Sequence, residues 1–345
     1  MPKRSRNSSP PPPPRLLHRL PVPIPRHRSF QNFTLDTLIS KIQSSSSIVI
    51  LAGAGISTSC GIKDFRSPNS GIYSLIAASK NPFLSAIGEP QEVFNFETFS
   101  TEPEIFYAAA PIVLSSMLQT STPSLTHQFI TKLEEHGKLS TCFTQNIDGL
   151  EEKAGLSSSR LIQCHGDLKH ASCLKCSASV PIEQILPVAM TGNVPLCEKQ
   201  IQKRTKTKSG SSSSSSKQST SISCGGVMKP SCVFFYEPLP SSLLTSLQEA
   251  AKTADLLLII GTSLNVAPVN LLPRMVKSDI PVVLINKERI SSLKSVEFDL
   301  ELIGDADVIV NEIIRQLKWS DHLSNKSLTI VKSSSVSPVY IVSKL

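Results

Sequence analysis

The sequence contains no run of 18 apolar residues, which is about the length that a membrane-spanning helix needs. We therefore expect no membrane span. Acidic residues are also missing from residues 1–35, although this stretch holds seven Lys and Arg. A second stretch, residues 198–217, holds six Lys and Arg and a single acid, Glu198. The formal net charge of +8 therefore comes from two basic arms, and the rest of the chain is mildly acidic.

The two arms have the composition of disordered segments. Residues 1–30 are rich in Pro and Arg, residues 199–222 are rich in Ser and Lys, and we expect residues 321–345 to form a flexible tail. Basic arms of this kind suit chromatin, nucleic acid or another anionic surface, or serve only as solvated tails. The segment "PKRSR" favours nuclear import. Because the arm also has the Arg and Ser content of a transit peptide, an organelle or the cytoplasm remains the alternative.

A glycine-rich turn in "LAGAGISTSCGIKDFRS" lacks two features of ordinary nucleotide-binding loops. Gly53 and Gly55 supply the first two glycines of G-x-G-x-x-G, but Thr58 stands at the third position, and no G-K-[ST] follows. A turn of small residues at a strand end still lets a backbone approach a phosphate group closely. We therefore interpret Gly53, Ala54 and Gly55 as a cofactor loop of an unusual kind.

Short apolar strands alternate with helical segments between the arms, which predicts a doubly wound, parallel α/β sheet of the Rossmann-like type. Ligands bind beyond the carboxyl ends of the strands in such sheets. Small and polar residues follow four predicted strands at 53–66, 145–148, 261–263 and 286–288. We expect these four segments to line one cleft.

Four cysteines predict a smaller, inserted zinc-binding domain at about residues 166–230. Cys173 and Cys176 form C-x-x-C, and Cys197 and Cys224 follow at longer distances. Four thiolates at such spacing favour a closed, structural zinc site over a redox pair or unligated thiols. His170 is a conceivable substitute ligand. The remaining cysteines are predicted to be buried thiols: Cys60, Cys142, Cys164 and, on an inward-facing strand, Cys232. Eight cysteines without a signal peptide favour a reducing compartment.

Several motifs in series resemble the sirtuins, the NAD-dependent protein lysine deacylases. They are "GAGIS", "DFRS", "TQNIDGL", "CHGDL", the split cysteine quartet, "KPSCVFFYEPLP", "GTSLNVAP" and "LIN". The resemblance covers roughly residues 48–310, within a catalytic domain expected at 31–320. The zinc segment with its Ser/Lys insertion is most similar to the fungal-type nuclear branch that acts on histones.

The resemblance implies an NAD site and a catalytic group. His165 would be the general base, since imidazole suits proton removal near neutral pH. Asn146 and Asp148 would hold the nicotinamide carboxamide and would also count as catalytic, and Phe65 would shield the reactive ribose carbon. The implied cofactor-binding residues are Gly53, Ala54, Gly55, Asp64, Phe65, Arg66, Gln145, Asn146, Ile147, Asp148, Gly261, Thr262, Ser263, Asn286, Glu288 and Ala306.

The resemblance also implies an acetylated protein substrate, a histone by the branch it favours. The segment Val233 to Glu237 would pair with an extended peptide and enclose the acyl-lysine. The implied substrate residues are Val233, Phe234, Phe235, Glu237 and Val266. The acetyl group would pass to ADP-ribose, releasing nicotinamide and O-acetyl-ADP-ribose.

Three positions depart from the family pattern. Lys63 replaces a Pro, Gln200 replaces the regular fourth cysteine, and Tyr236 replaces a Gly. Two other readings of the sequence stay open: an NAD-dependent ADP-ribosyltransferase and a non-catalytic NAD-binding chromatin scaffold.

Overall fold

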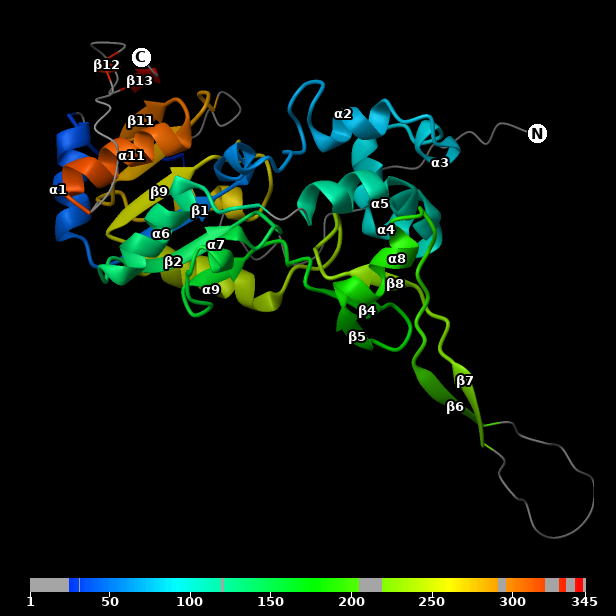
Figure 1. Cartoon of the computed structure of the whole chain (residues 1–345). Helices are drawn as coiled ribbons and strands as arrows, with labels where there is room; N and C mark the ends of the chain where they lie inside the picture. Colours follow the sequence, from blue (N-terminus) through cyan, green and yellow to red (C-terminus); the bar gives the residue numbers. More distant parts are fainter. Residues whose placement is uncertain are drawn as a thin grey trace, which may run out of the picture.

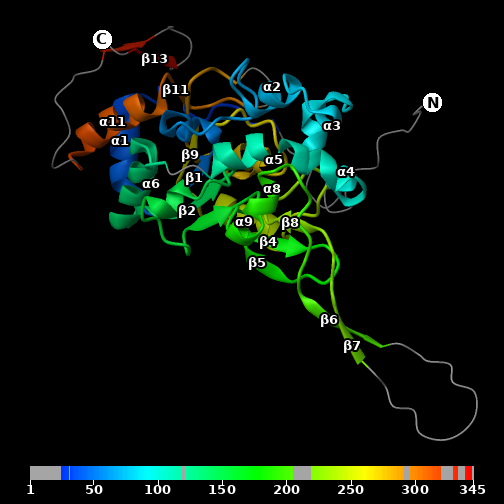
Figure 2. The same cartoon turned by 45° about the vertical axis from the view of Figure 1, so that its right-hand side comes forward.

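The computed structural model describes residues 25–30, 32–118, 121–204, 219–290, 296–319, 329–332 and 339–343. These residues form a larger lobe built on a β-sheet and a smaller lobe beside it, from which a long β-hairpin projects (Figure 1, Figure 2). In this described part of the chain, no helix is both long enough and apolar enough to cross a membrane.

The larger lobe is centred on an eight-stranded sheet with the order β12-β13-β11-β10-β9-β1-β2-β3. Its strands are β1 Ile48–Ala52, β2 Leu139–Thr144, β3 Leu161–Gln163, β9 Leu256–Ile260, β10 Val282–Asn286, β11 Leu300–Ile303, β12 Thr329–Lys332 and β13 Val339–Ser343. All six strands from β11 to β3 run parallel. Numbered along the chain, they follow the order 3-2-1-4-5-6 of Rossmann-type sheets. The predicted doubly wound sheet is confirmed.

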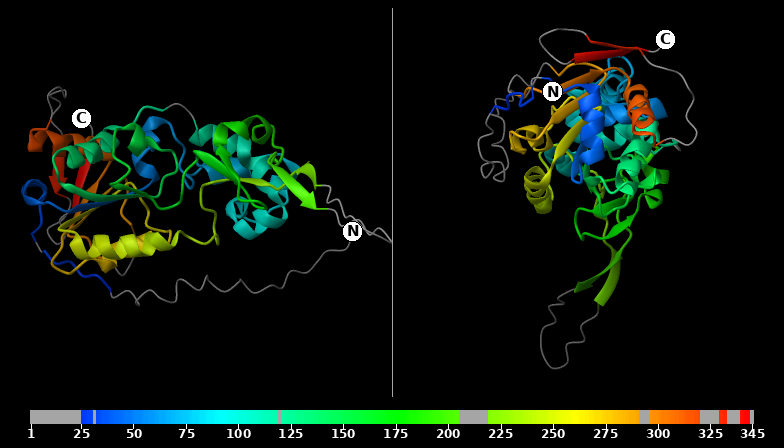
Figure 3. Two further views of the ribbon diagram at one scale, coloured as in Figure 1. Left: turned by 90° about the horizontal axis from the view of Figure 1, so that it is seen from below. Right: turned by 90° about the vertical axis from the view of Figure 1, so that its left-hand side faces the viewer.

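Helices cover both faces of this sheet (Figure 3). One face packs against α1 Leu35–Ser44, α6 Leu125–Glu135 and α11 Ala306–Leu317, and the other packs against α9 Ser241–Thr253 and α10 Leu272–Met275. The short helix α7, Leu150–Lys153, follows β2. All five residues of β1 are buried, since Ile48 and Ile50 enter one core and Val49 and Leu51 enter the other. This burial on two sides explains why the strand is apolar without alternation.

The smaller lobe combines a helical part with a three-stranded sheet. Its helices are α2 Ile72–Ala77, α3 Pro82–Ser85, α4 Phe96–Thr101, α5 Pro103–Met117 and α8 Leu186–Ala189. Its strands are β4 His170–Cys173, β5 Ser179–Pro181 and β8 Met228–Pro230, and they pair in the order β5-β4-β8. Edge-to-face aromatic contacts join the helices to the segment after β8; for example, the rings of Phe99 and Phe234 lie 5.2 Å apart.

Part of the insertion predicted to be disordered is an ordered hairpin instead. Strands β6 Gln200–Arg204 and β7 Ser219–Ser223 pair antiparallel over five residue pairs. The middle of the insertion, residues 205–218, lies outside the described residues. The Ser- and Lys-rich composition does not predict this hairpin, because the hydrogen bonds between its strands need only backbone groups. The cysteine module holds the ends of the two strands together.

The predictions for both ends of the chain also need correction. The segment 321–345 was expected to be a flexible tail, but β13 pairs parallel with β11 and β12 pairs with β13. At the other end, Arg26 of the predicted disordered arm is buried and forms a 2.7 Å ion pair with the fully buried Asp299. The edge of the sheet at β11 is the partner of the C-terminal strands, and the buried Asp299 carboxylate is the partner of Arg26. The composition of the two segments reveals neither partner. Residues 1–24 lie outside the described part.

Candidate active site

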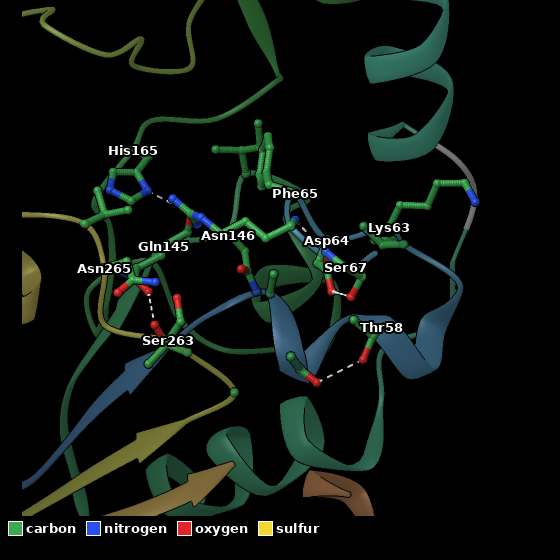
Figure 4. Close-up of a pocket in the computed structure, with 18 of the residues that line it drawn as sticks. Thr58, Lys63, Asp64, Phe65, Ser67, Gln145, Asn146, His165, Ser263 and Asn265 are labelled. Atoms are coloured by element: carbon green, nitrogen blue, oxygen red, sulfur yellow. Dashed lines mark hydrogen bonds between the residues drawn. The ribbon is translucent and has the colours of Figure 1, made fainter. Parts of the chain in front are cut away.

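A cavity of about 1390 Å³ opens at the carboxyl ends of the parallel strands. The segments that follow β1, β2, β3, β9 and β10 all contribute to its lining, as expected for the point where a doubly wound sheet changes direction. The smaller lobe closes the opposite wall with aromatic side chains such as Phe94 and Phe234. Figure 4 labels lining residues from the segments after β1, β2, β3 and β9.

Almost every residue that the sequence suggested for the site lines this cavity. The lining includes Ala54, Gly55, Asp64, Phe65, Arg66, Gln145, Asn146, Ile147, His165, Val233, Phe234, Phe235, Glu237, Gly261, Thr262, Ser263, Val266, Asn286, Glu288 and Ala306. Gly53 and Asp148 do not belong to the lining. Gly53 lies just behind it, where its carbonyl oxygen accepts a hydrogen bond from the Asn146 side chain.

The glycines of the first turn are required by the packing of two loops. A Cβ atom on Gly53 would lie 2.6 Å from the Cβ of Thr262, and one on Gly55 would lie 2.7 Å from the Cα of Gly261. Gly261 itself has a φ of +63°, which favours glycine. The turn continues into 3₁₀ segments at Ala54–Ile56 and Thr58–Cys60 and starts no α-helix, unlike the glycine turns that bind phosphate at a helix N-terminus.

The segment 64–66 forms a wall of the cavity. Asp64 accepts hydrogen bonds from the backbone N–H groups of Arg66 and Ser67 at 2.9 and 2.6 Å, so its carboxylate stabilises the turn of this loop. The ring of Phe65 lies 5.7 Å from the ring of Tyr73 and 5.6 Å from that of Phe94. Two other rings therefore hold Phe65 in place at this wall of the cavity.

The segment after β2 presents its amide side chains and turns its carboxylate inward. Asn146 donates to the carbonyl oxygen of Gly53 and to Oγ of Ser57, both at 3.2 Å, and Gln145 Oε1 accepts from the Thr262 hydroxyl at 2.6 Å. Asp148 Oδ1 accepts from the backbone N–H of Leu150 at 3.0 Å. The carboxylate of Asp148 thus bonds to the first N–H of α7, and the residue lies outside the cavity lining where we expected it.

His165 has the geometry of a general base. Its Nδ1 lies 2.9 Å from the carbonyl oxygen of Gln145, which can only accept a hydrogen bond, so the hydrogen of the neutral ring is assigned to Nδ1. The lone pair is then on Nε2, which has no partner among the described residues. Burial lowers the pKa of His165, although the bond to Gln145 acts in the opposite direction. A neutral imidazole with a free acceptor nitrogen at the cavity is ready to take a proton.

The segment expected to bind an extended substrate is not a strand. Phe235 makes a single parallel bridge with Asn95, and the chain turns at Tyr236, where the N–H of Glu237 donates to the carbonyl oxygen of Phe234 at 3.1 Å. The N–H of Val233 donates to the carbonyl oxygen of His165 at 2.7 Å. Intramolecular bonds therefore occupy backbone groups of 233–235 that we assigned to a peptide, because this loop must also fix the segment that carries His165.

The sequence motifs above did not single out one charged residue beneath this loop. Lys229 is buried, and its Nζ contacts Glu237 Oε2 at 2.9 Å, the carbonyl oxygen of Cys232 at 2.7 Å and the ring of Phe234 at 4.2 Å. These contacts hold both ends of the loop together. A lysine just before an apolar run is the signal that could have identified it, since a charge buried there needs a partner.

The four predicted cysteine ligands lie together, with all four sulfur atoms within 4.8 Å of one another. The Sγ atoms of Cys173 and Cys224 and those of Cys176 and Cys197 are each 3.7 Å apart. Tetrahedral coordination with Zn–S bonds of about 2.3 Å requires sulfur atoms about 3.8 Å apart, so the four side chains fit zinc. His170 is exposed and does not belong to the cluster.

The hairpin explains how Cys224 reaches this cluster across the insertion. The N–H of Cys224 donates to the carbonyl oxygen of Lys199, and the N–H of Gly225 donates to that of Cys197, at 2.8 and 3.0 Å. The paired strands β6 and β7 thus bring Cys224 back beside Cys197, where the insertion begins. Gln200, which stands at the regular position of the fourth cysteine, begins β6 instead.

Strand order and cavity together define a Rossmann-type α/β protein with an inserted cysteine module. Residues 53–268 match the Sir2 family. The chain is 36% identical over 310 residues to the NAD-dependent protein deacetylase hst2-2 of Emericella nidulans, covering 89% of this chain and 78% of the relative. It is 38% identical to the NAD-dependent histone deacetylase SIR2 of Saccharomyces cerevisiae, covering 84% of this chain and 51% of that protein. The chain therefore belongs to the Sir2 family.

Solved structures of the family have the same fold. A structure of Sir2 with a deacetylated p53 peptide and 3'-O-acetyl-ADP-ribose matches with a TM-score of 0.64 and 28% sequence identity. The match covers 82% of this chain and 98% of the Sir2 chain. A second structure, of Sir2 with a p53 peptide and NAD+, has a TM-score of 0.62 and 27% identity, covering 83% of this chain and 100% of its own.

Proposed function

We propose that this chain is an NAD-dependent protein lysine deacetylase that transfers the acetyl group of an acetyl-lysine to ADP-ribose. The observation that carries the proposal is the orientation of His165, a residue that lines the cavity: its Nδ1 is committed to a backbone carbonyl, and its Nε2 is a buried acceptor with no partner among the described residues. The names of relatives that cover most of this chain support the same activity.

In this proposal, each of the cavity residues has a separate role. Bound NAD supplies the ADP-ribose that accepts the acetyl group and releases nicotinamide. His165 takes a proton at Nε2 from a ribose hydroxyl, Phe65 excludes water, and Asn146 presents its amide group to the nicotinamide side. The loops at 237–239 and 265–267 line the cavity at the substrate side and would hold the peptide.

The four cysteines would hold a structural zinc ion, because four thiolate ligands leave no coordination position for substrate. We further propose a histone as the physiological substrate and the nucleus as the compartment. The basic composition of residues 1–24 and 205–218, which lie outside the described part, supports the association with chromatin that this requires.

The test is an incubation of the full chain with an acetyl-lysine histone peptide, with and without NAD, followed by mass spectrometry. We expect deacetylated peptide, nicotinamide and O-acetyl-ADP-ribose only with NAD, and their loss in His165→Ala. His170→Ala is the matched control, since this histidine is exposed and outside the cavity; it should retain activity.

Two results of this assay would overturn the proposal. Release of nicotinamide with the acetyl group retained on the peptide would identify an ADP-ribosyltransferase or a hydrolase. Binding of NAD without any turnover would identify a non-catalytic NAD-binding protein. One equivalent of zinc per chain in the purified protein, lost in Cys224→Ser and kept in His170→Ala, is the separate test of the metal site.

A further inference from the structure

A buried cluster of ionisable side chains lies next to the lining segment 145–147 but outside the cavity lining. It consists of His127 from α6, Asp148 from the loop after β2 and Glu151 from α7, with one nitrogen or oxygen atom of each within 4.8 Å of the others. His127 is 0% exposed and Glu151 is 1% exposed. Neither residue touches the cavity, and the proposed reaction uses neither.

Two atoms of this cluster have no hydrogen-bond partner among the described residues. They are Nε2 of His127 and Oε2 of Glu151. Nδ1 of His127 is already engaged by the N–H and the hydroxyl of Ser124, at 3.2 and 2.8 Å, so only Nε2 is available to the carboxylates. Buried polar atoms without a partner are costly. A proton or a water molecule held between the imidazole and the carboxylates removes this cost.

Glu151 is connected to the cavity by a chain of hydrogen bonds. Its Oε1 accepts a hydrogen bond from the Thr144 hydroxyl at 2.5 Å, and the Thr144 oxygen in turn accepts from the backbone N–H of Asn146 at 3.1 Å. Because the Thr144 hydrogen points to Glu151, an oxygen lone pair is free to face Asn146. The carboxyl group of Glu151 thereby fixes the backbone of a residue that lines the cavity.

We propose that His127 and Glu151 are positioning residues for NAD: they hold the segment from Asn146 to Asp148 in its nicotinamide-binding conformation through Thr144 and through the Asp148 carboxylate. This inference rests on the proposed function, because it assigns a support to the same site. It gives a functional reason for keeping a carboxyl group in a place where an apolar side chain would be the more stable choice.

The test uses four variants of the full chain. Thr144→Val removes the central hydroxyl at nearly constant volume, and Thr144→Ser restores it. Glu151→Gln removes the charge that α7 places in the cluster. Glu152→Gln is the matched control, because Glu152 is the adjacent acid but pairs with Lys169 at the surface, at 2.5 Å.

The measurements are the Kd of NAD by calorimetry, the KM values for NAD and for acetyl-peptide, and the melting temperature. We expect Thr144→Val to weaken NAD binding by about tenfold, the size of one lost hydrogen bond. Glu151→Gln should weaken it by less, because its amide oxygen can still accept from Thr144 but without the charge that strengthens the bond. The KM for peptide should stay within about twofold in both variants. Thr144→Ser and Glu152→Gln should bind NAD like the wild type. Glu151→Gln should also raise the melting temperature at pH 8. A residue with a purely structural role would not give higher stability together with weaker NAD binding.

Three results would overturn the inference. The first is an unchanged NAD affinity in both Thr144→Val and Glu151→Gln. The second is an equal rise of both KM values together with a lower melting temperature, which would show a general loss of structure. The third is a second metal equivalent in the wild-type protein that is lost in Glu151→Gln, which would make the cluster a metal site. A wild-type protein that binds no NAD would instead contradict the proposed function itself.

Discussion

Tyr236 is held in a backbone conformation that favours glycine, and replacing it should stabilise the protein. Its φ is +65°, and it occupies the third position of the turn closed by the bond from the Glu237 N–H to the Phe234 carbonyl. A residue with a Cβ costs about 1–2 kcal/mol in this region. Glycine avoids that cost but loses roughly 0.5–1 kcal/mol through the greater freedom of its unfolded chain. Tyr236→Gly should therefore gain somewhat under 1 kcal/mol.

The tyrosine ring adds little to this balance, because the side chain is 64% exposed. A gain of this size corresponds to a rise in melting temperature of about 2 °C for a domain of 150–250 residues. Differential scanning calorimetry of the full chain measures this shift. Tyr236→Ala is the control, since it removes the ring and keeps the Cβ and thus the strain; its melting temperature should not rise.

Either of two results would refute this reasoning. A lower melting temperature in Tyr236→Gly would show that the ring stabilises the loop more than its exposure suggests. An equal rise in Tyr236→Ala would show that the ring itself, and not the left-handed backbone, destabilises the protein.

Three further changes test other parts of the structure. Gly55→Ala should lower stability by about 1–3 kcal/mol and weaken NAD binding, because the new Cβ would lie 2.7 Å from the Cα of Gly261; denaturant unfolding and calorimetry measure the two effects. Arg26→Ala should cost about 3–5 kcal/mol in urea unfolding, because it leaves Asp299 charged and buried without its partner, and a loss under 1 kcal/mol would contradict the docking of residues 25–30. Burial raises the pKa of Glu151 from 4.5 to about 7, so the folded state holds its proton more tightly than the unfolded state does. Stability should fall by roughly 3 kcal/mol as the pH rises from about 4.5 to above 7, and Glu151→Gln should remove this slope.

Local sequence patterns were sufficient for the sheet and for most of the cavity. A strand such as β1, apolar at every position, fits only a sheet covered on both faces, and small or polar residues directly after such strands meet at one edge. The cysteine spacing likewise indicated a four-sulfur cluster, because few arrangements other than metal binding use this pattern.

Local patterns failed where a segment depends on partners that lie far away in the chain. The apolar run at 233–237 has the composition of a buried strand, but Lys229 and the aromatic rings of the smaller lobe bend it into a turn. The polar composition of β6 and β7 concealed a hairpin, and the Pro-rich arm concealed the ion pair of Arg26. Propensity describes a segment alone, whereas each of these outcomes is decided by a contact from another element.

Local patterns along the chain predict the fold class, the approximate edge of the sheet at which ligands bind, and the residue types of the site. The proton position on His165 and the gathering of His127 with Asp148 and Glu151 arise from long-range contacts. These features depend on hydrogen bonds whose directions are set by backbone groups of other strands and helices. A one-dimensional pattern records which donors and acceptors exist, and the folded chain alone determines which of them meet.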